Sequence, residues 1–215
     1  MITLSLLLYK DTMSYKNINQ TTEKQTIIPI WYIDIYKNTH TRNIFDQYKF
    51  KNKSNNKYLL NIATDICINT ILDYSDYNII FTYPPSTMFY RKEKNIDSMG
   101  NLVMQVKKYL CFYFKTDNNN YSFKNIFSID KKHLKNKKAQ HIDGTRKTRT
   151  KNLNERYYVN FWNKRYLKNI CKNSKVMICI IDDVSSTGGT LLACKNSLGS
   201  VIGDDIRIEL YSLAH

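Results

Sequence analysis

The most constraining feature of this sequence is a pattern near its C-terminus that is typical of a βαβ unit. The apolar run Lys175–Ile181 predicts a buried strand, and Leu191–Leu198 has the spacing of a helix. Gly199 is a natural helix C-cap, and a second strand is expected over Asp205–Leu213. Strand, helix and strand in this order indicate a parallel pairing. The sequence therefore predicts an α/β fold, with a mostly parallel twisted sheet and helices on both faces.

The loop between this strand and this helix is rich in groups that suit a phosphorylated sugar. Gly188 and Gly189 are adjacent in a chain with only 6 glycines, which indicates a close approach of the backbone to a ligand. Asp182 and Asp183 can accept hydrogen bonds from sugar hydroxyls or hold water around Mg²⁺. A helix N-terminus and hydroxyl side chains suit phosphate; the hydroxyls belong to Ser185, Ser186, Thr187 and Thr190. A strand followed by an N-capped helix with solvated acids is the plainer interpretation, but it explains neither the paired acids nor the paired glycines.

Two other phosphate-binding motifs are absent. A P-loop requires a Lys after its second glycine, and Thr190 follows Gly189 here. The G-x-G-x-x-G fingerprint of dinucleotide-binding folds does not occur either.

Upstream of this unit, the sequence predicts further helices, strands and an N-terminal lobe. Residues 1–30 are weakly patterned, and 1–44 are expected to form an extension or hood, with 45–215 as the main domain. Asp97 or Ser98 is the expected N-cap of a helix. Helical spacing covers Tyr58–Leu72 and Asp97–Phe114, and β-rich runs cover Ile27–Tyr36, Tyr77–Tyr83, Ser122–Ile129 and Tyr157–Trp162. The aromatic residues Tyr157, Tyr158, Phe161 and Trp162 are expected to pack in the core or hood rather than to stack on bases.

The segment Val176–Leu191 resembles the phosphoribosyl-pyrophosphate (PRPP) motif of type I phosphoribosyltransferases, in which four apolar residues and two acids precede a Thr/Gly-rich phosphate loop. The resemblance implies that Asp182 and Asp183 bind the ribose 2- and 3-hydroxyls. It implies that the loop from Ser185 to Thr190 holds the 5-phosphate, with Mg²⁺ accompanying PRPP. Purine-salvage members carry an acid at the position of Ser186, so serine there disfavours purine salvage.

Upstream segments are similar to the ComF/GntX family, the competence-associated phosphoribosyltransferase-like proteins, over about residues 45–215. These segments are Tyr48-Lys49-Phe50-Lys51, Tyr83-Pro84-Pro85-Ser86, Arg91-Lys92 with Asn95, and Gln140 followed by Arg149 and Asn152. The chain departs from the family in two respects. It lacks the N-terminal four-cysteine zinc module, and Lys92-Glu93-Lys94-Asn95-Ile96 replaces the family's Arg-Gly-Phe-Asn-Gln segment.

The resemblance implies two further parts of a site. The turn of Tyr83, Pro84, Pro85 and Ser86 would bind pyrophosphate together with Arg91, and a cis X-Pro bond there would aim N–H groups at an oxyanion. The alternatives are a plain turn and a solvated Arg91.

Residues 131–151 hold nine Lys and Arg and one Asp, a net charge of +8. By the resemblance they would form the flexible loop that closes over PRPP, with Arg149 joining Asp182 and Asp183 in catalysis. The residues of this loop are Lys138, Gln140, Arg146, Arg149 and Asn152. The alternatives are a grip on a nucleic-acid backbone and an unstructured basic loop.

Composition limits the remaining possibilities. The net charge of +15, from 33 Lys and Arg against 18 Asp and Glu, reflects either A/T-rich codons or attraction to polyanions. The 5 Cys and 4 His residues show no spacing typical of a metal site or a disulfide framework. Because no apolar run is long enough for a membrane span, a cytoplasmic protein without membrane contact is expected.

Two functions are therefore expected. The first is transfer of phosphoribosyl from Mg²⁺-PRPP to an unidentified acceptor, with release of pyrophosphate. The alternative is a DNA-uptake factor that binds single-stranded DNA or a competence helicase and uses the PRPP-type pocket for ligand sensing. A homodimer is compatible with both.

Overall fold

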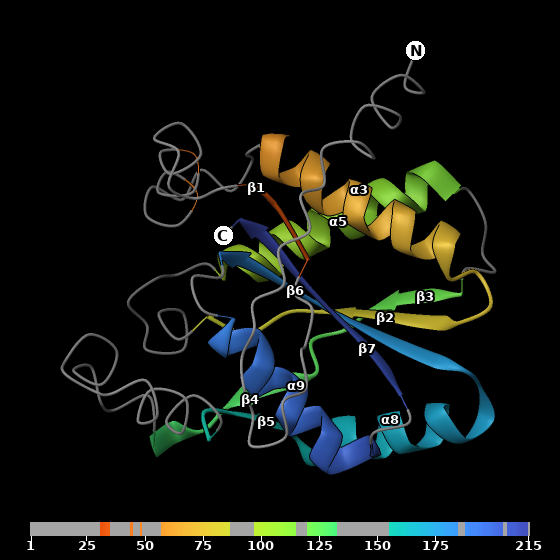
Figure 1. Ribbon diagram of the computed structural model, residues 1–215, viewed down its shortest axis with the longest axis vertical. Coiled ribbons are helices and arrows are strands. Elements are labelled where there is room, and N and C mark those ends of the chain that lie inside the picture. Colours follow the sequence, from red (N-terminus) through yellow and green to blue (C-terminus); the bar gives the residue numbers. More distant parts are fainter. Residues whose placement is uncertain are drawn as a thin grey trace.

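The computed structural model describes residues 31–34, 44, 48, 57–86, 97–114, 120–132, 155–184, 188–203 and 206–214. Within them the chain forms an α/β fold, with helices on both faces of a parallel sheet (Figure 1). In chain order the elements are β1 (Trp31–Asp34), α3 (Lys57–Asp73), β2 (Asn78–Thr82), α5 (Ser98–Phe114), β3 (Tyr121–Phe123), β4 (Phe127–Ile129), β5 (Tyr157–Val159), α8 (Phe161–Asn173), β6 (Val176–Val184), α9 (Gly189–Ile202) and β7 (Arg207–Ala214).

The main sheet has five strands in the order β1-β7-β6-β2-β3, and every pairing in it is parallel. From β2 the chain passes through α5 to β3 on one side, whereas from β6 it passes through α9 to β7 on the other. The direction of winding therefore reverses between the neighbouring strands β2 and β6. Such a switch point leaves a crevice outside the carboxyl ends of the two strands, where open α/β sheets bind ligands. A separate two-stranded antiparallel sheet pairs β4 with β5.

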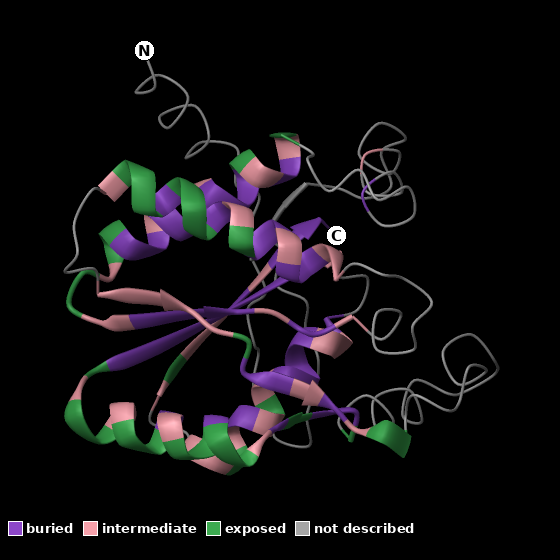
Figure 2. Ribbon diagram, turned by 180° about the vertical axis from the view of Figure 1, so that it is seen from behind, coloured by how far each residue is buried: buried purple, intermediate pink, exposed green. Residues whose placement is uncertain are grey.

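Two apolar layers cover the sheet, because alternate side chains of each strand point to opposite faces. Met177 and Cys179 of β6 pack with α3 and α5, whereas Ile178 and Ile180 pack with α9, β5 and Leu167 of α8. Figure 2 shows the buried residues concentrated on the sheet and on the helix faces turned toward it. A strand buried on both faces is expected to be continuously apolar, as Lys175–Ile181 is after its first residue.

The predicted helices over Tyr58–Leu72 and Asp97–Phe114 are confirmed as α3 and α5, and the strand over Tyr77–Tyr83 is confirmed as β2. Asp97 is the residue that caps α5, since its carboxylate accepts a hydrogen bond from the Gly100 N–H at 3.3 Å. The run Ser122–Ile129 contains two strands rather than one. β3 joins the main sheet and β4 the small one.

The βαβ unit is confirmed, but its boundaries differ from the predicted ones. β6 continues past Ile181 to Val184, because Asp182 and Val184 still pair with Ser212 and Ala214 of β7. α9 passes through Gly199 and ends at Ile202. Its C-cap is Gly203, whose N–H donates to the Gly199 carbonyl at 3.1 Å.

The largest error of the sequence-based prediction is α8. A strand was expected over Tyr157–Trp162, but the strand ends at Val159 and a helix begins at Phe161. The helix buries Asn163 and Leu167 and packs Tyr166, Ile170 and Cys171 against the core, so its apolar residues do recur at helical spacing, and the prediction overlooked this pattern. Asn160 starts it by accepting a hydrogen bond from the Asn163 N–H at 2.9 Å.

The predicted N-terminal extension contributes to the main sheet. Trp31–Asp34 form β1, which pairs in parallel with β7 as an edge strand. Within residues 1–44, the structure otherwise describes Ile44 alone, which packs against the core. The rest of the predicted hood lies outside the described residues.

Candidate functional site

Two segments that are about 100 residues apart in the sequence meet at the carboxyl edge of the sheet. Thr82, the last residue of β2, pairs with Ile180 of β6. The Tyr83-Pro84-Pro85-Ser86 turn therefore leaves β2 beside the point where β6 reaches Asp182 and Asp183. Both segments lie at the switch point of the sheet.

The two aspartates lie within β6, not in a loop after it. The Asp183 N–H donates to the Asp182 carboxylate at 2.9 Å, and the Val184 N–H donates to the Asp183 carboxylate at 2.7 Å. Asp182 is 9% exposed, whereas Asp183 is partly exposed. Asp183 is thus the more accessible of the two to a ligand.

The carboxylates interact with different layers, as expected for consecutive strand residues. On the α9 side, burial and then the charge of Asp182 raise the pKa of Cys194 well above its usual value. On the α5 side, burial and then the charge of Asp183 raise the pKa of Tyr48 well above its usual value. Asp182 also raises the pKa of Tyr48, but less than Asp183 does, so Asp182 lies nearer the α9 side and Asp183 nearer the α5 side.

Asp183 belongs to a group of polar residues on the α5 side. The Tyr48 side chain is fully buried, and its hydroxyl contacts the Met99 sulfur at 3.8 Å. Burial raises the pKa of Asp97, backbone N–H groups lower it, and the nearby Asp183 raises it. Tyr48, Asp97 and Asp183 therefore place a phenol and two carboxylates close together. Such a group suits hydroxyls or a solvated cation more than it suits a phosphate.

Gly100 allows this group to form. A Cβ atom at this position would lie 2.7 Å from the Tyr83 hydroxyl oxygen and 3.0 Å from a carboxylate oxygen of Asp97. The absence of a side chain lets Tyr83, at the end of β2, and Asp97, at the start of α5, both approach the helix. Sequence reasoning assigned Asp97 only a capping role and gave Gly100 none. The signal that was available is topological, because a helix that follows a parallel strand begins at the carboxyl edge.

The Pro84-Pro85 turn is buried, and Ser86 after it is partly exposed. No cis peptide bond occurs among the described residues, so both X-Pro bonds of this turn are trans. The cis geometry considered as one of two alternatives for this turn is therefore not adopted. Because Pro lacks an N–H group, backbone donors in the turn are limited to Tyr83 and Ser86.

The glycine pair starts α9 at the same edge. Gly188 has φ +70°, a left-handed conformation that favours glycine, and its carbonyl accepts the first helical hydrogen bond from the Leu192 N–H at 2.9 Å. The helix begins at Gly189, and Thr190 in its first turn is partly exposed. Ser185, Ser186 and Thr187 lie outside the described residues.

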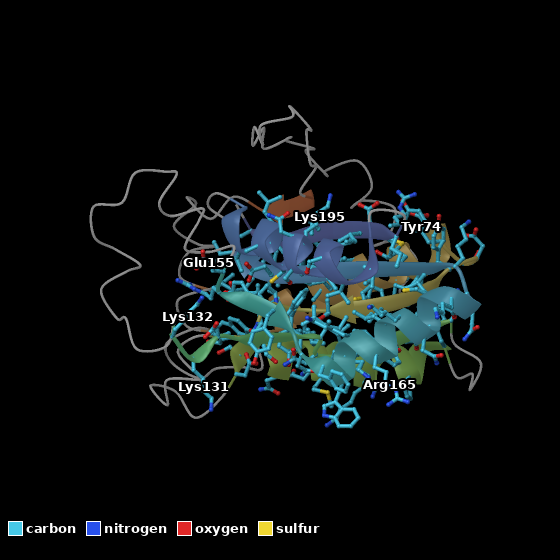
Figure 3. The ribbon with its side chains drawn as sticks, turned by 90° about the horizontal axis from the view of Figure 1, so that it is seen from below. Tyr74, Lys131, Lys132, Glu155, Arg165 and Lys195 are labelled. Carbon is cyan, nitrogen blue, oxygen red and sulfur yellow. The ribbon has the colours of Figure 1, made fainter. Side chains whose placement is uncertain are left out.

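The predicted flexible loop also lies outside the described residues, except at its start. Lys132 forms ion pairs with Asp130 at 3.7 Å and with Glu155 at 3.5 Å (Figure 3). The contact between Lys132 and Glu155 links the residue just before the 133–154 segment to the residue just after it. The residues of this loop prediction that are not described are Lys138, Gln140, Arg146, Arg149 and Asn152, and Arg91 of the predicted pyrophosphate site is not described either.

Arg156 is a residue that the sequence analysis missed. It is buried, and its Nε makes no hydrogen bond within the described part of the chain. The pKa of the neighbouring Tyr157 is raised by burial and, to a smaller extent, by Cys194 and Asp182. Arg156 acts in the opposite direction and lowers the pKa of Tyr157. A buried guanidinium with an N–H group to spare is suited to an anion. A single arginine after a basic segment provides no sequence signal of this kind.

Comparisons with protein-family models and with curated proteins found no match to this sequence. Among the described helices, none combines the length and the apolar character that a membrane crossing requires.

Proposed function

We propose that the chain has a type I phosphoribosyltransferase-like fold and binds Mg²⁺-PRPP at the carboxyl edge of β2 and β6. The observation that carries this proposal is that Asp182, Asp183 and the N-terminus of α9 meet the Tyr83–Ser86 turn at the switch point of a parallel sheet. The acids provide acceptors for sugar hydroxyls, and the helix N-terminus provides a phosphate subsite.

The residues present fit Mg²⁺ only as an ion carried by the substrate. No group of three potential metal ligands occurs among the described His, Cys, Asp and Glu residues. Mg²⁺ is commonly bound through one or two carboxylates together with substrate phosphates and water. Asp183, partly exposed, would hold this hydrated ion or the ribose hydroxyls, while the ion would supply charge for the departing pyrophosphate.

The proposed reaction is a displacement at C1 of the ribose. The bond from C1 to the pyrophosphate oxygen breaks and its electron pair leaves with the pyrophosphate, while a nitrogen of the acceptor forms the new bond and loses its proton. The resemblance implies an oxocarbenium-like transition state, which nearby cations stabilise by neutralising the leaving group. Arg149 of the basic segment would contribute such a cation.

A protection experiment with separate parts of PRPP tests this proposal. Mg²⁺-PRPP should raise the melting temperature of the full chain, and ribose 5-phosphate and pyrophosphate should each raise it by a smaller amount. The Asp182→Asn, Asp183→Asn double variant should lose protection by PRPP and any pyrophosphate release. Protection that is equal in the double variant and the wild type would show that the ligand binds elsewhere.

A further inference from the structure

The outer face of α8 exposes large aromatic rings. Phe161 is 68% exposed and Trp162 is 72% exposed, and their rings meet edge to face with centroids 5.5 Å apart. Tyr158 of the adjacent strand β5 is also exposed. The expectation that Tyr158, Phe161 and Trp162 are buried by packing in the core or hood is therefore wrong, and of the four aromatic residues Tyr157 alone is buried as expected. Exposed aromatic rings grouped in this way mark an interaction surface.

Cations share this face with the aromatic rings. Lys164, Arg165, Lys168 and Lys172 are exposed, and their spacing places them along one side of the helix. From Phe161 to Lys172 the row is about 16 Å long. The sequence of α8 contains no acidic residue. Figure 3 shows Arg165 projecting from the helix away from the sheet.

Phe161, Trp162 and the four cations line an open groove of about 800 Å³. The lining residues that the structure describes all belong to α8, and none of them belongs to the candidate site. Tyr166 lies in the groove, and the Lys124 ammonium sits over its ring at 3.6 Å from the centroid. The cation–π contact with Tyr166 holds Lys124 at this groove, and the Lys124 ammonium adds to its positive charge.

We propose that this face of α8 binds single-stranded nucleic acid. Exposed aromatic rings offer stacking surfaces for unpaired bases, and a row of cations follows the phosphate backbone. A duplex hides the faces of its bases, so Phe161 and Trp162 would have no stacking partner on it. The surface differs from the 131–151 segment, and the inference does not rest on PRPP binding.

A membrane surface fits α8 less well. A helix that lies in a bilayer interface directs one continuous apolar face into the lipid. In α8 the apolar Leu167 is fully buried against the core, and the exposed side mixes Phe161 and Trp162 with the cations. This mixture suits a ligand that alternates flat bases with phosphates.

The test is a titration of the full chain with fluorescein-labelled oligothymidylate of about 12 nucleotides at low ionic strength. Wild type should bind, with a log–log dependence of affinity on salt that has a slope of about −3. Trp162→Ala should weaken binding at least about fivefold. Lys164→Gln with Arg165→Gln should weaken binding and flatten the salt slope by about 1.4. In a Trp31→Phe background, the fluorescence of Trp162 should be quenched by unlabelled oligothymidylate.

The helix α5 provides matched controls on the opposite face of the sheet. Its Phe112 is 78% exposed, and Lys107 and Lys108 are adjacent exposed cations, as Lys164 and Arg165 are. Phe112→Ala, and Lys107→Gln with Lys108→Gln, should leave the affinity close to that of wild type. Asp183→Asn should do the same, which separates this inference from the proposed PRPP site.

Three results would overturn the inference. The first is no binding of oligothymidylate at low salt. The second is equal weakening by the α5 and α8 variants, which would mean that the overall charge of the chain attracts the strand without a defined surface. The third is binding of phosphatidylserine vesicles that depends on Trp162, together with oligothymidylate binding that does not depend on it.

Discussion

Gly100 and Tyr83 are in close contact at the carboxyl edge of the sheet: a Cβ atom on Gly100 would lie 2.7 Å from the Tyr83 hydroxyl oxygen. Tyr83 follows β2, and Gly100 lies in the first turn of α5. This contact brings the end of a central strand to the start of a helix, and Asp97 lies beside both. The geometry of the candidate site on the α5 side therefore depends on a residue without a side chain.

Replacing Gly100 tests this dependence. Gly100→Ala should lower the free energy of unfolding by about 1 kcal/mol, because Tyr83 and Asp97 must move away from the new methyl group. In a Tyr83→Phe background the hydroxyl is absent, so the same substitution should cost about 1 kcal/mol less. Urea denaturation of the four proteins in this cycle measures the coupling. An equal cost in both backgrounds would mean that the Tyr83 hydroxyl does not limit the space.

The two ends of α9 allow a second comparison. Gly188 has φ +70° and Gly203 has φ +77°, so alanine at either position is strained. Each substitution should lower stability by about 1–2 kcal/mol. Only Gly188→Ala should also weaken PRPP binding, because Gly188 lies at the carboxyl edge and Gly203 at the far end of the helix. Calorimetry of both variants checks this, and a similar loss of PRPP affinity in Gly203→Ala would contradict it.

The carboxyl group of Asp97 predicts a pH dependence of stability. Burial raises its pKa in the folded protein above the unfolded value. Between these two pKa values the folded state binds more protons than the unfolded state. The free energy of unfolding therefore falls as the pH rises from the unfolded pKa through the folded pKa. At neutral pH the ionised Asp97 leaves the protein less stable than it is at low pH, as far as this group is concerned. Asp97→Asn keeps a capping side chain and removes the buried charge.

We therefore expect Asp97→Asn to be more stable than wild type at pH 7, with the difference shrinking as the pH falls through the folded pKa of Asp97 toward its unfolded value. Denaturant unfolding at a series of pH values measures the difference. A variant that is less stable than wild type at neutral pH would show that the charge of Asp97 contributes more as a helix cap than it costs through burial.

Asn160 tests the start of α8. Its side chain accepts a hydrogen bond from the Asn163 N–H at 2.9 Å. Asn160→Ala should cost about 1 kcal/mol, whereas Asn160→Asp should retain most of the stability, because aspartate is an equally good cap. Thermal unfolding compares the two variants. If alanine and aspartate have the same effect, the helix does not begin at this residue.

The central part of the fold follows from the sequence because its signals are local. Lys175–Ile181 is apolar at every position after its first, and such a run specifies a strand buried on both faces. The helices that cover it are also visible as periodic apolar residues. The extension of β6 through Asp182 to Val184 was not predictable in the same way, because it depends on pairing with Ser212 and Ala214 of a distant strand.

α8 was missed although Leu167, Ile170 and Cys171 recur at helical spacing, because the β-rich run Tyr157–Trp162 was interpreted as one strand across its start. Its buried face consists of Leu167 and Asn163, and the Asn163 amide donates to the carbonyls of Asn125 and Ile126 at 3.1 and 2.9 Å. These two hydrogen bonds fix the start of the helix on the core and could not be read from the sequence, because their partners lie 38 and 37 residues away. At the candidate site, the loop chemistry of Asp182 to Thr190 was visible in the sequence. The approach of Tyr48 and Asp97 to Asp183 was not, because it depends on how three separate segments pack.

Calorimetric titration of Mg²⁺-PRPP into the full chain and into its Asp182→Asn, Asp183→Asn variant tests the central claim most directly. The account predicts a saturable heat of binding for wild type and none for the double variant, with the variant still folded by circular dichroism. No heat with wild type at millimolar PRPP, or the same heat with both proteins, would contradict the assignment of this edge as a PRPP site.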